Sequence, residues 1–199
     1  MFWDKAAKFY DLFEKVYNNK VYKNLGKEVA KAIEPADTVL ECACGTGKIS
    51  SAVAAKCKKL IATDYSLNML KRARKKCAKY PNAEFAFADI THLEYADCSF
   101  DKVIAGNVIH LLDDPIGALK ELERVCRAGG KIIVPTYIME KKGKRSALVG
   151  AMDKAGADFK QHFTLQSYRE FFESAGYKGV EYSVVEGRMP CVIAVIAKN

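Results

Sequence analysis

The sequence lacks a long hydrophobic run. Its longest apolar stretches, such as Val192 to Ala197, are only a few residues long, whereas a helix needs about 18 or more apolar residues to cross a bilayer. The first residues, Met1 to Lys8, carry charge and lack an apolar run that ends in a small-residue cleavage site, so no signal peptide is expected. Together these two absences predict a soluble, cytoplasmic protein.

The cysteine pattern of a secreted or zinc-binding protein is also missing. The seven cysteines are an odd number scattered along the chain, and this pattern predicts reduced thiols rather than disulfides. Cys42 and Cys44 stand one residue apart, without the spacing or the His and Cys companions of a zinc site. We therefore expect no metal site.

No heptad, no Gly-X-Y period and no repeat of roughly 20 to 50 residues is present, so coiled coil, collagen and solenoid are excluded. What is present is a chain of 199 residues with 50% hydrophobic and 28% charged residues. Such a composition is typical of a chain that buries a core, which argues against disorder. The length predicts a single domain, residues 1–199.

The chain carries 32 Lys and Arg against 24 Asp and Glu, which gives a net charge of +8. The lysines cluster at 56–59, 71–79 and 141–145, and such clusters can attract phosphate-rich partners. No aromatic residues interleave them, as a single-strand binder would need. We interpret them as solvated helix and loop surfaces, and an RNA-binding or RNA-modifying protein remains an alternative.

Short apolar segments alternate with segments of helical spacing along most of the chain. Caps at Ser66, Asp114-Pro115 and Thr164 mark helix starts, and the helix after Pro115 is expected to run to Gly129-Gly130. Strands are predicted at residues 39–42, 60–63, 84–88, 102–105, 131–135, 180–185 and 192–197. Alternating strands and helices predict an α/β fold, with a mainly parallel sheet covered by helices on both faces. The last two strands are joined too closely for a parallel crossover, so they should form an antiparallel hairpin.

Two helices are expected before the first strand, and we interpret residues 1–34 as an N-terminal helical cover. Residues 137–163 combine a basic run with a short helix and are interpreted as an insertion near the substrate site. The residues expected to face inward are Ala6, Phe9, Phe13 and Val16 in the first helix and Leu25, Val29 and Ile33 in the second.

Unusual residues stand where four of the predicted strands end, and ligands bind outside the carboxyl ends of strands in open parallel sheets. The first strand runs into a turn of small residues, Glu41-Cys42-Ala43-Cys44-Gly45-Thr46-Gly47. Its glycines have no Cβ, so a ligand can approach the backbone closely. The N–H groups of the following helix suit an anionic group.

Asp64 ends the second strand, 17 positions beyond Gly47, where a carboxylate can accept hydrogen bonds from both hydroxyls of a ribose. Asp89 and Ile90 end the third strand and could bind an exocyclic amine and pack on a purine ring. Asn107 follows the fourth. Each residue alone also fits a helix cap or a turn, but together they predict a nucleoside-bearing ligand.

The order of these motifs resembles the class I S-adenosylmethionine-dependent methyltransferase family, and most of all its small-molecule branch of ubiquinone/menaquinone-type enzymes. The resemblance implies a Rossmann-like sheet of order 3-2-1-4-5-7-6 with strand seven antiparallel, S-adenosyl-L-methionine as cofactor, and a small or amphipathic methyl acceptor. The motifs that carry it are V-L-E-C-A-C-G-T-G, I-A-T-D-Y-S, F-A-F-A-D-I, F-D-K-V-I-A-G-N-V-I-H-L-L and G-G-K-I-I-V.

The resemblance also assigns roles to single positions. It implies that Glu41 contacts the methionine ammonium, Asp64 the ribose, and Asp89 with Ile90 the adenine. Ala43 stands where the family usually has glycine, and the extra methyl should be tolerated if φ is negative there. The remaining implied cofactor contacts are Tyr10, Gly45, Gly47, Tyr65, Met69 and Asn107.

No catalytic residue is assigned. His110, just past the fourth strand, could take a proton near neutral pH or be structural, and Tyr137 ends the fifth strand; we name both as candidate acceptor contacts. An aromatic cover over the site could come from Phe2, Trp3, Phe9 and Tyr10. A second alternative is an NAD-dependent oxidoreductase, for which Asp64 would fit the ribose, but Ser50 stands where its fingerprint needs a third glycine or alanine.

Overall fold

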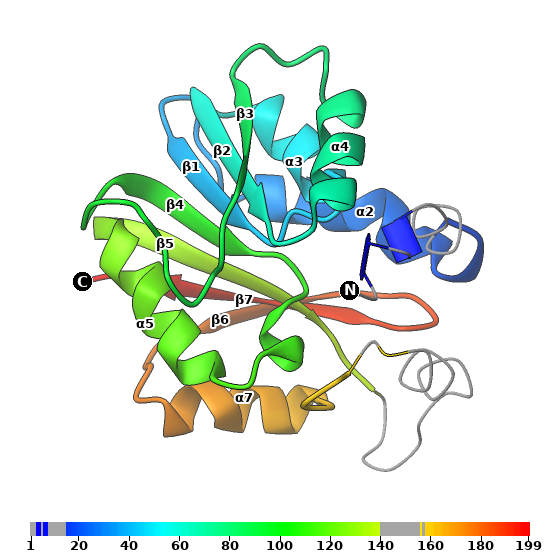
Figure 1. The fold of residues 1–199 in the computed structure, drawn as a ribbon. Helices are drawn as coiled ribbons and strands as arrows, with labels where there is room; N and C mark the ends of the chain where they lie inside the picture. Colours follow the sequence, from blue (N-terminus) through cyan, green and yellow to red (C-terminus); the bar gives the residue numbers. More distant parts are fainter. Residues whose placement is uncertain (1–2, 5, 8–14, 140–155, 157) are drawn as a thin grey trace.

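The computed structural model describes residues 3–4, 6–7, 15–139, 156 and 158–199. Its strands form one sheet in the order β3-β2-β1-β4-β5-β7-β6 (Figure 1). The strands are β1 (Thr38–Cys42), β2 (Lys59–Asp64), β3 (Ala83–Phe87), β4 (Phe100–Ala105), β5 (Cys126–Tyr137), β6 (Glu181–Val185) and β7 (Cys191–Ala197). The helices are α2 (Asn19–Ala30), α3 (Lys48–Ala54), α4 (Leu67–Lys76), the short 3-10 helix η1 (Ile109–Leu111), α5 (Pro115–Val125) and α7 (Leu165–Ser174).

Strands β1 to β5 are mutually parallel, and β7 runs antiparallel to both of its neighbours. Residue Tyr137, at the end of β5, lies opposite Cys191, at the start of β7. The predicted strand order and the C-terminal hairpin are therefore both confirmed. β2 and β3 lie on one side of β1, whereas β4 and β5 lie on the other, so the order in which strands are added to the sheet reverses between β1 and β4. Open α/β sheets bind ligands at such a switch point.

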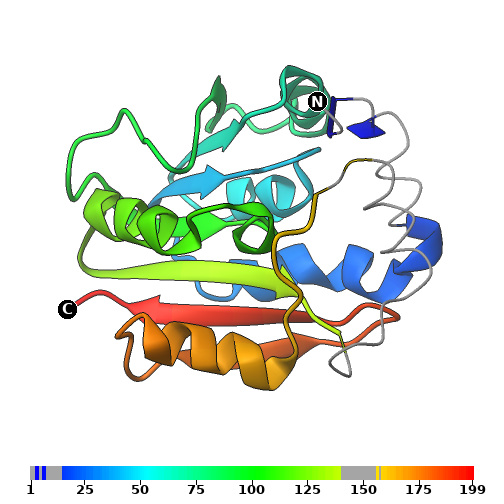
Figure 2. The same cartoon turned by 60° about the horizontal axis from the view of Figure 1, so that its bottom comes forward.

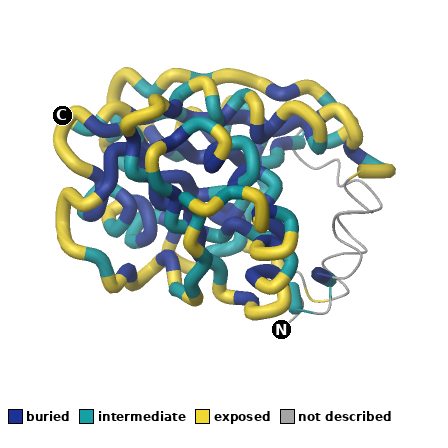
Figure 3. Tube along the Cα trace, turned by 90° about the horizontal axis from the view of Figure 1, so that it is seen from above, coloured by how far each residue is buried: buried dark blue, intermediate teal, exposed yellow. Residues whose placement is uncertain are grey.

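Two hydrophobic cores lie on opposite faces of the sheet. Helices α2, α3 and α4 pack on one face, around Val39 and Ile104, and α5 and α7 pack on the other, around Leu40 and Val103 (Figure 2). Successive strand residues point to opposite faces, so a strand buried on both sides is apolar throughout. In Figure 3 the buried stretches of the chain lie mainly in the interior, and the exposed stretches lie mainly at the periphery. Glu41 stands two residues after Val39 on β1, so its side chain points to the same face of the sheet, the one that α3 covers.

Helix starts follow the side chains that the sequence offers. The Ser66 hydroxyl accepts a hydrogen bond from the Met69 amide and caps α4, and Asp114 accepts from Gly117 at the start of α5. Thr164 and Ser167 form a reciprocal capping box at the start of α7. Such caps satisfy backbone N–H groups that the first turn leaves without partners. All three predicted caps are confirmed.

Two local expectations are wrong. The helix predicted to run to Gly129-Gly130 ends at Val125, because the chain is already extended at Cys126, which pairs with Phe100 of β4. Val16, expected to face inward, is 72% exposed. Phe9 and Phe13 lie outside the described residues.

The ends of the predicted insertion at residues 137–163 meet beside η1. The amide of Met139 donates to the Phe163 carbonyl at 2.8 Å, and the amides of Lys160 and Gln161 both donate to the His110 carbonyl at 3.1 Å. In the part of the chain that the structure describes, no helix combines the length and the apolarity that a membrane crossing requires.

Candidate functional site

A cavity of about 670 Å³ lies at the carboxyl ends of β1, β2 and β4. Most of the cofactor contacts predicted from the sequence meet there. The predicted residues that line it are Glu41, Ala43, Gly45, Asp64, Tyr65, Met69, Asp89, Ile90 and Asn107. Gly47 supports the turn without lining the cavity, and Tyr10 lies outside the described residues.

Asp64 is the half-buried carboxylate at the end of β2. Its Oδ2 accepts a hydrogen bond from the Gly45 amide at 2.7 Å, and its Oδ1 accepts from the Ser66 amide at 2.8 Å. Desolvation raises the pKa of Asp64 above its usual value, against the lowering effect of these amides. Two backbone donors therefore fix the orientation of a carboxylate that faces the cavity, and its remaining lone pairs can accept from ligand hydroxyls.

Glu41 is 1% exposed, and neither of its carboxylate oxygens accepts a hydrogen bond among the described residues. Burial raises the pKa of Glu41 to about 8, and the nearby Asp64 charge acts in the same direction, while Ser50 opposes it. A buried carboxylate without partners is costly unless a cation or donors reach it. Because Glu41 lines the cavity, a cationic donor such as an ammonium group fits this position.

The turn between β1 and α3 is built from residues in the left-handed region. Gly45 has φ 55° and Gly47 has φ 81°, a region that glycine enters without steric cost. Ala43 also has φ 54°, so the condition under which the extra methyl should be tolerated without strain, a negative φ, is not met. The backbone of Ala43, which lines the cavity, is therefore strained, because an L-residue with a Cβ rarely adopts this conformation.

The two residues assigned to the adenine, Asp89 and Ile90, differ in burial. Asp89 is exposed, and its Oδ1 accepts from both the amide and the hydroxyl of Thr91, at 2.9 and 2.7 Å. Ile90, by contrast, is 7% exposed and belongs to the core on the α5 face. The ring of Tyr65 packs at a tilt of 38° against that of Phe87, with ring centroids 4.9 Å apart. The carboxylate of Asp89 and the apolar side chain of Ile90 thus both line the cavity just after the end of β3.

Asn107 follows β4 and also has a left-handed φ, 54°, which asparagine tolerates better than most residues. Its amide donates to the Pro135 carbonyl at 3.0 Å, and its side-chain oxygen lies 3.6 Å from the Cys191 sulfur. These contacts tie the loop after β4 to β5 and β7. They hold Asn107 in its place in the lining of the cavity.

The two predicted acceptor contacts are not brought to this cavity. His110 is 7% exposed and stacks on Phe159, with ring centroids 5.5 Å apart, and its Nδ1 has no hydrogen-bond partner among the described residues. Burial, together with His162, lowers the pKa of His110 to about 4, so this ring is neutral at pH 7. Tyr137 packs against the core on the α2 face.

The thiols beside the turn are protonated at neutral pH. Burial raises the pKa of Cys42 to about 12 and holds that of Cys44 well above its usual value. Thiolate, not thiol, is the nucleophile and the metal ligand. Among the residues that the structure describes, no group of three or more His, Cys, Asp or Glu is arranged to hold a metal ion.

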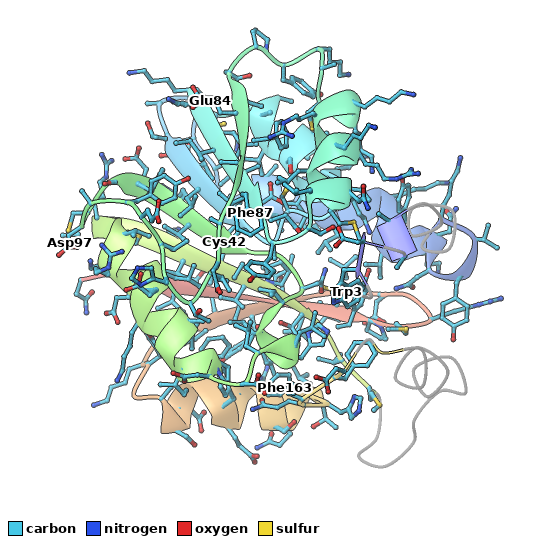
Figure 4. All side chains as sticks on the ribbon, in the orientation of Figure 1. Trp3, Cys42, Glu84, Phe87, Asp97 and Phe163 are labelled. Atoms are coloured by element: carbon cyan, nitrogen blue, oxygen red, sulfur yellow. The ribbon has the colours of Figure 1, made fainter. Side chains whose placement is uncertain are left out.

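Several lining residues were not predicted as site residues. Lys48 opens α3 directly after the glycine turn, and Leu111 and Leu112 follow His110 on the chain. Trp3, named from the sequence only as possible aromatic cover, also lines the cavity (Figure 4). The apolar pair could have been found from its place after the fourth strand, since the loops after strands form this edge of the sheet.

Comparison with known proteins gives a consistent result. A family model described as a methyltransferase domain matches residues 40–134. The chain is 36% identical over 142 residues to the ubiquinone/menaquinone biosynthesis C-methyltransferase UbiE of Bdellovibrio bacteriovorus, covering 66% of this chain and 58% of that protein. It is 28% identical over 209 residues to a demethylmenaquinone methyltransferase of Bacillus licheniformis, covering 93% of this chain and 90% of that protein. The aligned part of the chain thus spans less than two thirds of the Bdellovibrio protein.

The fold matches solved structures along the whole chain. The structure of an S-adenosylmethionine-dependent methyltransferase from Thermotoga maritima, described as a possible histamine N-methyltransferase, has a TM-score of 0.75. The match covers 100% of this chain and 99% of that chain at 20% sequence identity. At this identity the likeness establishes the architecture of the sheet and its helices.

Proposed function

Because the chain belongs to the class I S-adenosylmethionine-dependent methyltransferase family, in its ubiquinone/menaquinone-type branch, we propose that it transfers a methyl group from S-adenosyl-L-methionine to a small or amphipathic acceptor. The observation that carries the proposal is the pairing, in one cavity, of the oriented Asp64 carboxylate with the Glu41 carboxylate, whose oxygens accept no hydrogen bond among the described residues.

The residues present fit the cofactor. We propose that Glu41 binds the methionine ammonium, since a cation satisfies a buried carboxylate that lacks donors. Asp64 would accept from the ribose hydroxyls, and Asp89 with Ile90 would hold the adenine by its amine and its ring face. The turn at Gly45 lets the ligand approach the backbone closely. The other proposed contacts are Ala43, Tyr65, Met69 and Asn107.

When bound, S-adenosylmethionine supplies a methyl group on a sulfonium, which is already electrophilic. The task of the protein is therefore alignment and exclusion of water, rather than activation of the methyl. Holding the two reacting atoms about 3 to 3.5 Å apart can supply a large share of the rate gain. Asp64, held by its two amide donors, would bind the ribose, and Glu41 would bind the methionine ammonium. These groups lie on either side of the sulfonium, so the two contacts together would set the position of the methyl.

The rest of the cavity is largely apolar. Beyond the proposed cofactor contacts, its apolar lining residues include Leu25, Val108, Leu111, Leu112 and Trp3, and its polar ones include Lys48, Asp113 and Asp114. An apolar wall with a polar rim suits an acceptor with an apolar body and a polar reacting group. No histidine is among the described residues that line the cavity. We assign no general base.

The relatives support an acceptor of quinone type. Two of them carry the names of enzymes of ubiquinone or menaquinone synthesis, while another similar protein, 37% identical over 101 residues, is a malonyl-[acyl-carrier protein] O-methyltransferase. Since the fold does not choose the acceptor atom, we propose a demethylated quinol as the first compound to try and a wider search beside it.

The experiment uses the full chain with methyl-labelled S-adenosylmethionine. It is incubated in parallel with a demethylated menaquinol, with a cell metabolite extract and with total cellular RNA, and labelled products are identified by mass. We expect label in a quinol or another small molecule. Label in RNA alone would replace the proposed acceptor by the RNA alternative, and no turnover with any of the three, in a protein that does not bind S-adenosylhomocysteine, would refute the methyltransferase proposal.

A further inference from the structure

The chain contains a single tryptophan, Trp3, and it lines the cavity although it stands 38 positions before Glu41 in the sequence. Figures 1 and 2 both place residues 3–4 beside the N-terminal end of α4. The neighbouring residue, Asp4, makes the contacts that explain this placement. Trp3 therefore reaches the cavity through a specific attachment of the chain to α4.

The attachment consists of hydrogen bonds from the first turn of α4. The Ser66 hydroxyl donates to Asp4 Oδ1 at 2.5 Å, and the Asn68 amide lies 3.4 Å from the same oxygen. The Asn68 side-chain amide donates to the Asp4 carbonyl at 3.3 Å. The hydrogen bond from Ser66 lowers the pKa of Asp4, so this carboxylate is charged at neutral pH. A negative charge at a helix N-terminus is also favoured by the helix dipole.

Ser66 connects this attachment to the cavity. Its amide donates to Asp64 Oδ1 at 2.8 Å, and its hydroxyl oxygen accepts from the Met69 amide at 3.2 Å while the hydroxyl proton goes to Asp4. One serine, 1% exposed, thus holds a carboxylate on each side. Asp64 Oδ2 in turn accepts from Gly45. The hydrogen bonds run without a break from Asp4 to the turn after β1.

We propose that Asp4 is a positioning residue: through Ser66 it holds Trp3 as a wall of the cavity and couples that wall to the Asp64 carboxylate. Trp3 then screens the hydrogen bonds of Asp64 from water, and polar contacts strengthen where water is excluded. Loss of the Asp4 carboxylate loosens the attachment that holds Trp3 over the cavity and admits water to Asp64, while the Asp64 carboxylate and its two amide donors stay in place.

Trp3 itself reports on this arrangement, because its fluorescence can be excited selectively over that of the tyrosines. In the ligand-free protein, acrylamide should quench Trp3 weakly. Asp4→Ala should raise the quenching constant toward that of a free tryptophan, and Asp4→Asn, which keeps one acceptor oxygen for Ser66, should give an intermediate value. This part of the test needs no ligand, so it decides the proposal even if the proposed function fails.

The second measurement rests on the proposed function and uses S-adenosylhomocysteine. Asp4→Ala should weaken its binding by about threefold to tenfold, because water that reaches Asp64 weakens its contacts with the ligand by about as much as one hydrogen bond contributes, with the melting temperature nearly unchanged. In the wild type, titration should change the Trp3 emission with the same affinity that calorimetry reports. In Asp4→Ala this spectral change should be reduced.

Two controls separate positioning from general loosening. Ser66→Ala removes the Ser66–Asp4 hydrogen bond of the attachment together with the cap of α4, whereas Thr164→Ala removes the matching cap of α7 and leaves the attachment intact. Only Ser66→Ala should raise Trp3 quenching, and adding Asp4→Ala to it should cause little further change, since the two residues act through one contact. Unchanged quenching in Asp4→Ala and Ser66→Ala would overturn the proposal. Additive increases would do the same.

Discussion

The Gly45 amide donates a hydrogen bond of 2.7 Å to Asp64 Oδ2, which joins the turn after β1 to the end of β2. The second oxygen of the same carboxylate is held by the Ser66 amide. Both oxygens must therefore act as acceptors toward the protein before any ligand arrives. A ligand that donates to Asp64 finds a carboxylate whose orientation two different loops have already fixed, which reduces the entropy lost on binding.

This relationship makes Asp64→Asn a sharp test of the ribose contact. The asparagine NH₂ has to face either the Gly45 or the Ser66 amide, both of which are donors, and the ligand loses a charged acceptor. A hydrogen bond to a charged group contributes roughly 1.5 to 3 kcal/mol. We expect calorimetry to show affinity for S-adenosylhomocysteine reduced by about tenfold to a hundredfold.

The matched control is Asp97→Asn. Asp97 makes an exposed ion pair with Arg124 at 2.7 Å and does not line the cavity, so the same chemical change should leave the affinity as it is. If both variants bind alike, Asp64 has no contact with the ribose and the proposed placement of the cofactor is wrong.

Glu41 predicts a pH dependence. Burial raises its pKa to about 8, so below pH 8 the empty cavity holds mostly the neutral acid. A cationic ammonium favours the carboxylate, and binding at pH 7 should therefore release about one proton per molecule. Affinity for S-adenosylhomocysteine should rise with pH up to about 8 and then level off. Calorimetry at pH 7, in buffers with different ionisation enthalpies, measures the released proton directly.

Two variations test whether the proton release comes from the contact between Glu41 and the ammonium group. Glu41→Gln should bind with no proton release, and 5′-methylthioadenosine, which has no ammonium group, should release none from the wild type. The ligand-free wild type should also lose stability as pH rises from about 4.5 through 8, because an unfolded Glu41 ionises earlier than the folded one. Proton release that persists in Glu41→Gln would assign the titration to another group.

Much of the fold could be predicted, because the strands and helices are marked by strong local signals. Ser66, Asp114 and Thr164 cap helices where the sequence places them. The helix end at Val125 was missed, since the Gly129-Gly130 pair is a stronger local stop signal than Cys126. Pairing of Cys126 with Phe100 of β4 depends on a distant strand, which local patterns do not contain.

In the site, too, local patterns predict some residues, while long-range contacts place others. Asp64 and Asp89 could be found because strand ends meet at one edge of a parallel sheet. The side to which His110 turns depends on its packing against Phe159, and the approach of Trp3 depends on a hydrogen bond over 62 positions of sequence. Such long-range contacts leave no periodic signal, so neither placement could be predicted.

The strained Ala43 makes a stability prediction. A left-handed conformation costs an L-residue roughly 1 to 2 kcal/mol, while glycine adds about 0.4 to 1 kcal/mol of unfolded-state entropy. Ala43→Gly should thus increase the free energy of unfolding by up to about 1 kcal/mol, measured by urea denaturation. Ala52→Gly, within the ordinary helix α3, should decrease it by about 1 kcal/mol. A loss of stability in Ala43→Gly equal to that of Ala52→Gly would contradict the strain at Ala43.

The two glycines of the turn should respond differently: Gly47→Ala mainly lowers stability, and Gly45→Ala mainly weakens ligand binding. A Cβ at Gly47 would lie 3.0 Å from the Ala73 Cα of α4, at a φ of 81°, so Gly47→Ala should cost roughly 2 to 4 kcal/mol of stability through strain and overpacking. A Cβ at Gly45 meets nothing within 4 Å, and this residue lines the cavity. Gly45→Ala should cost only about 1 to 2 kcal/mol of stability but should weaken S-adenosylhomocysteine binding more than Gly47→Ala does, because its methyl occupies space that the ligand needs. The reverse order of the two affinities would show that the ligand does not approach the Gly45 backbone.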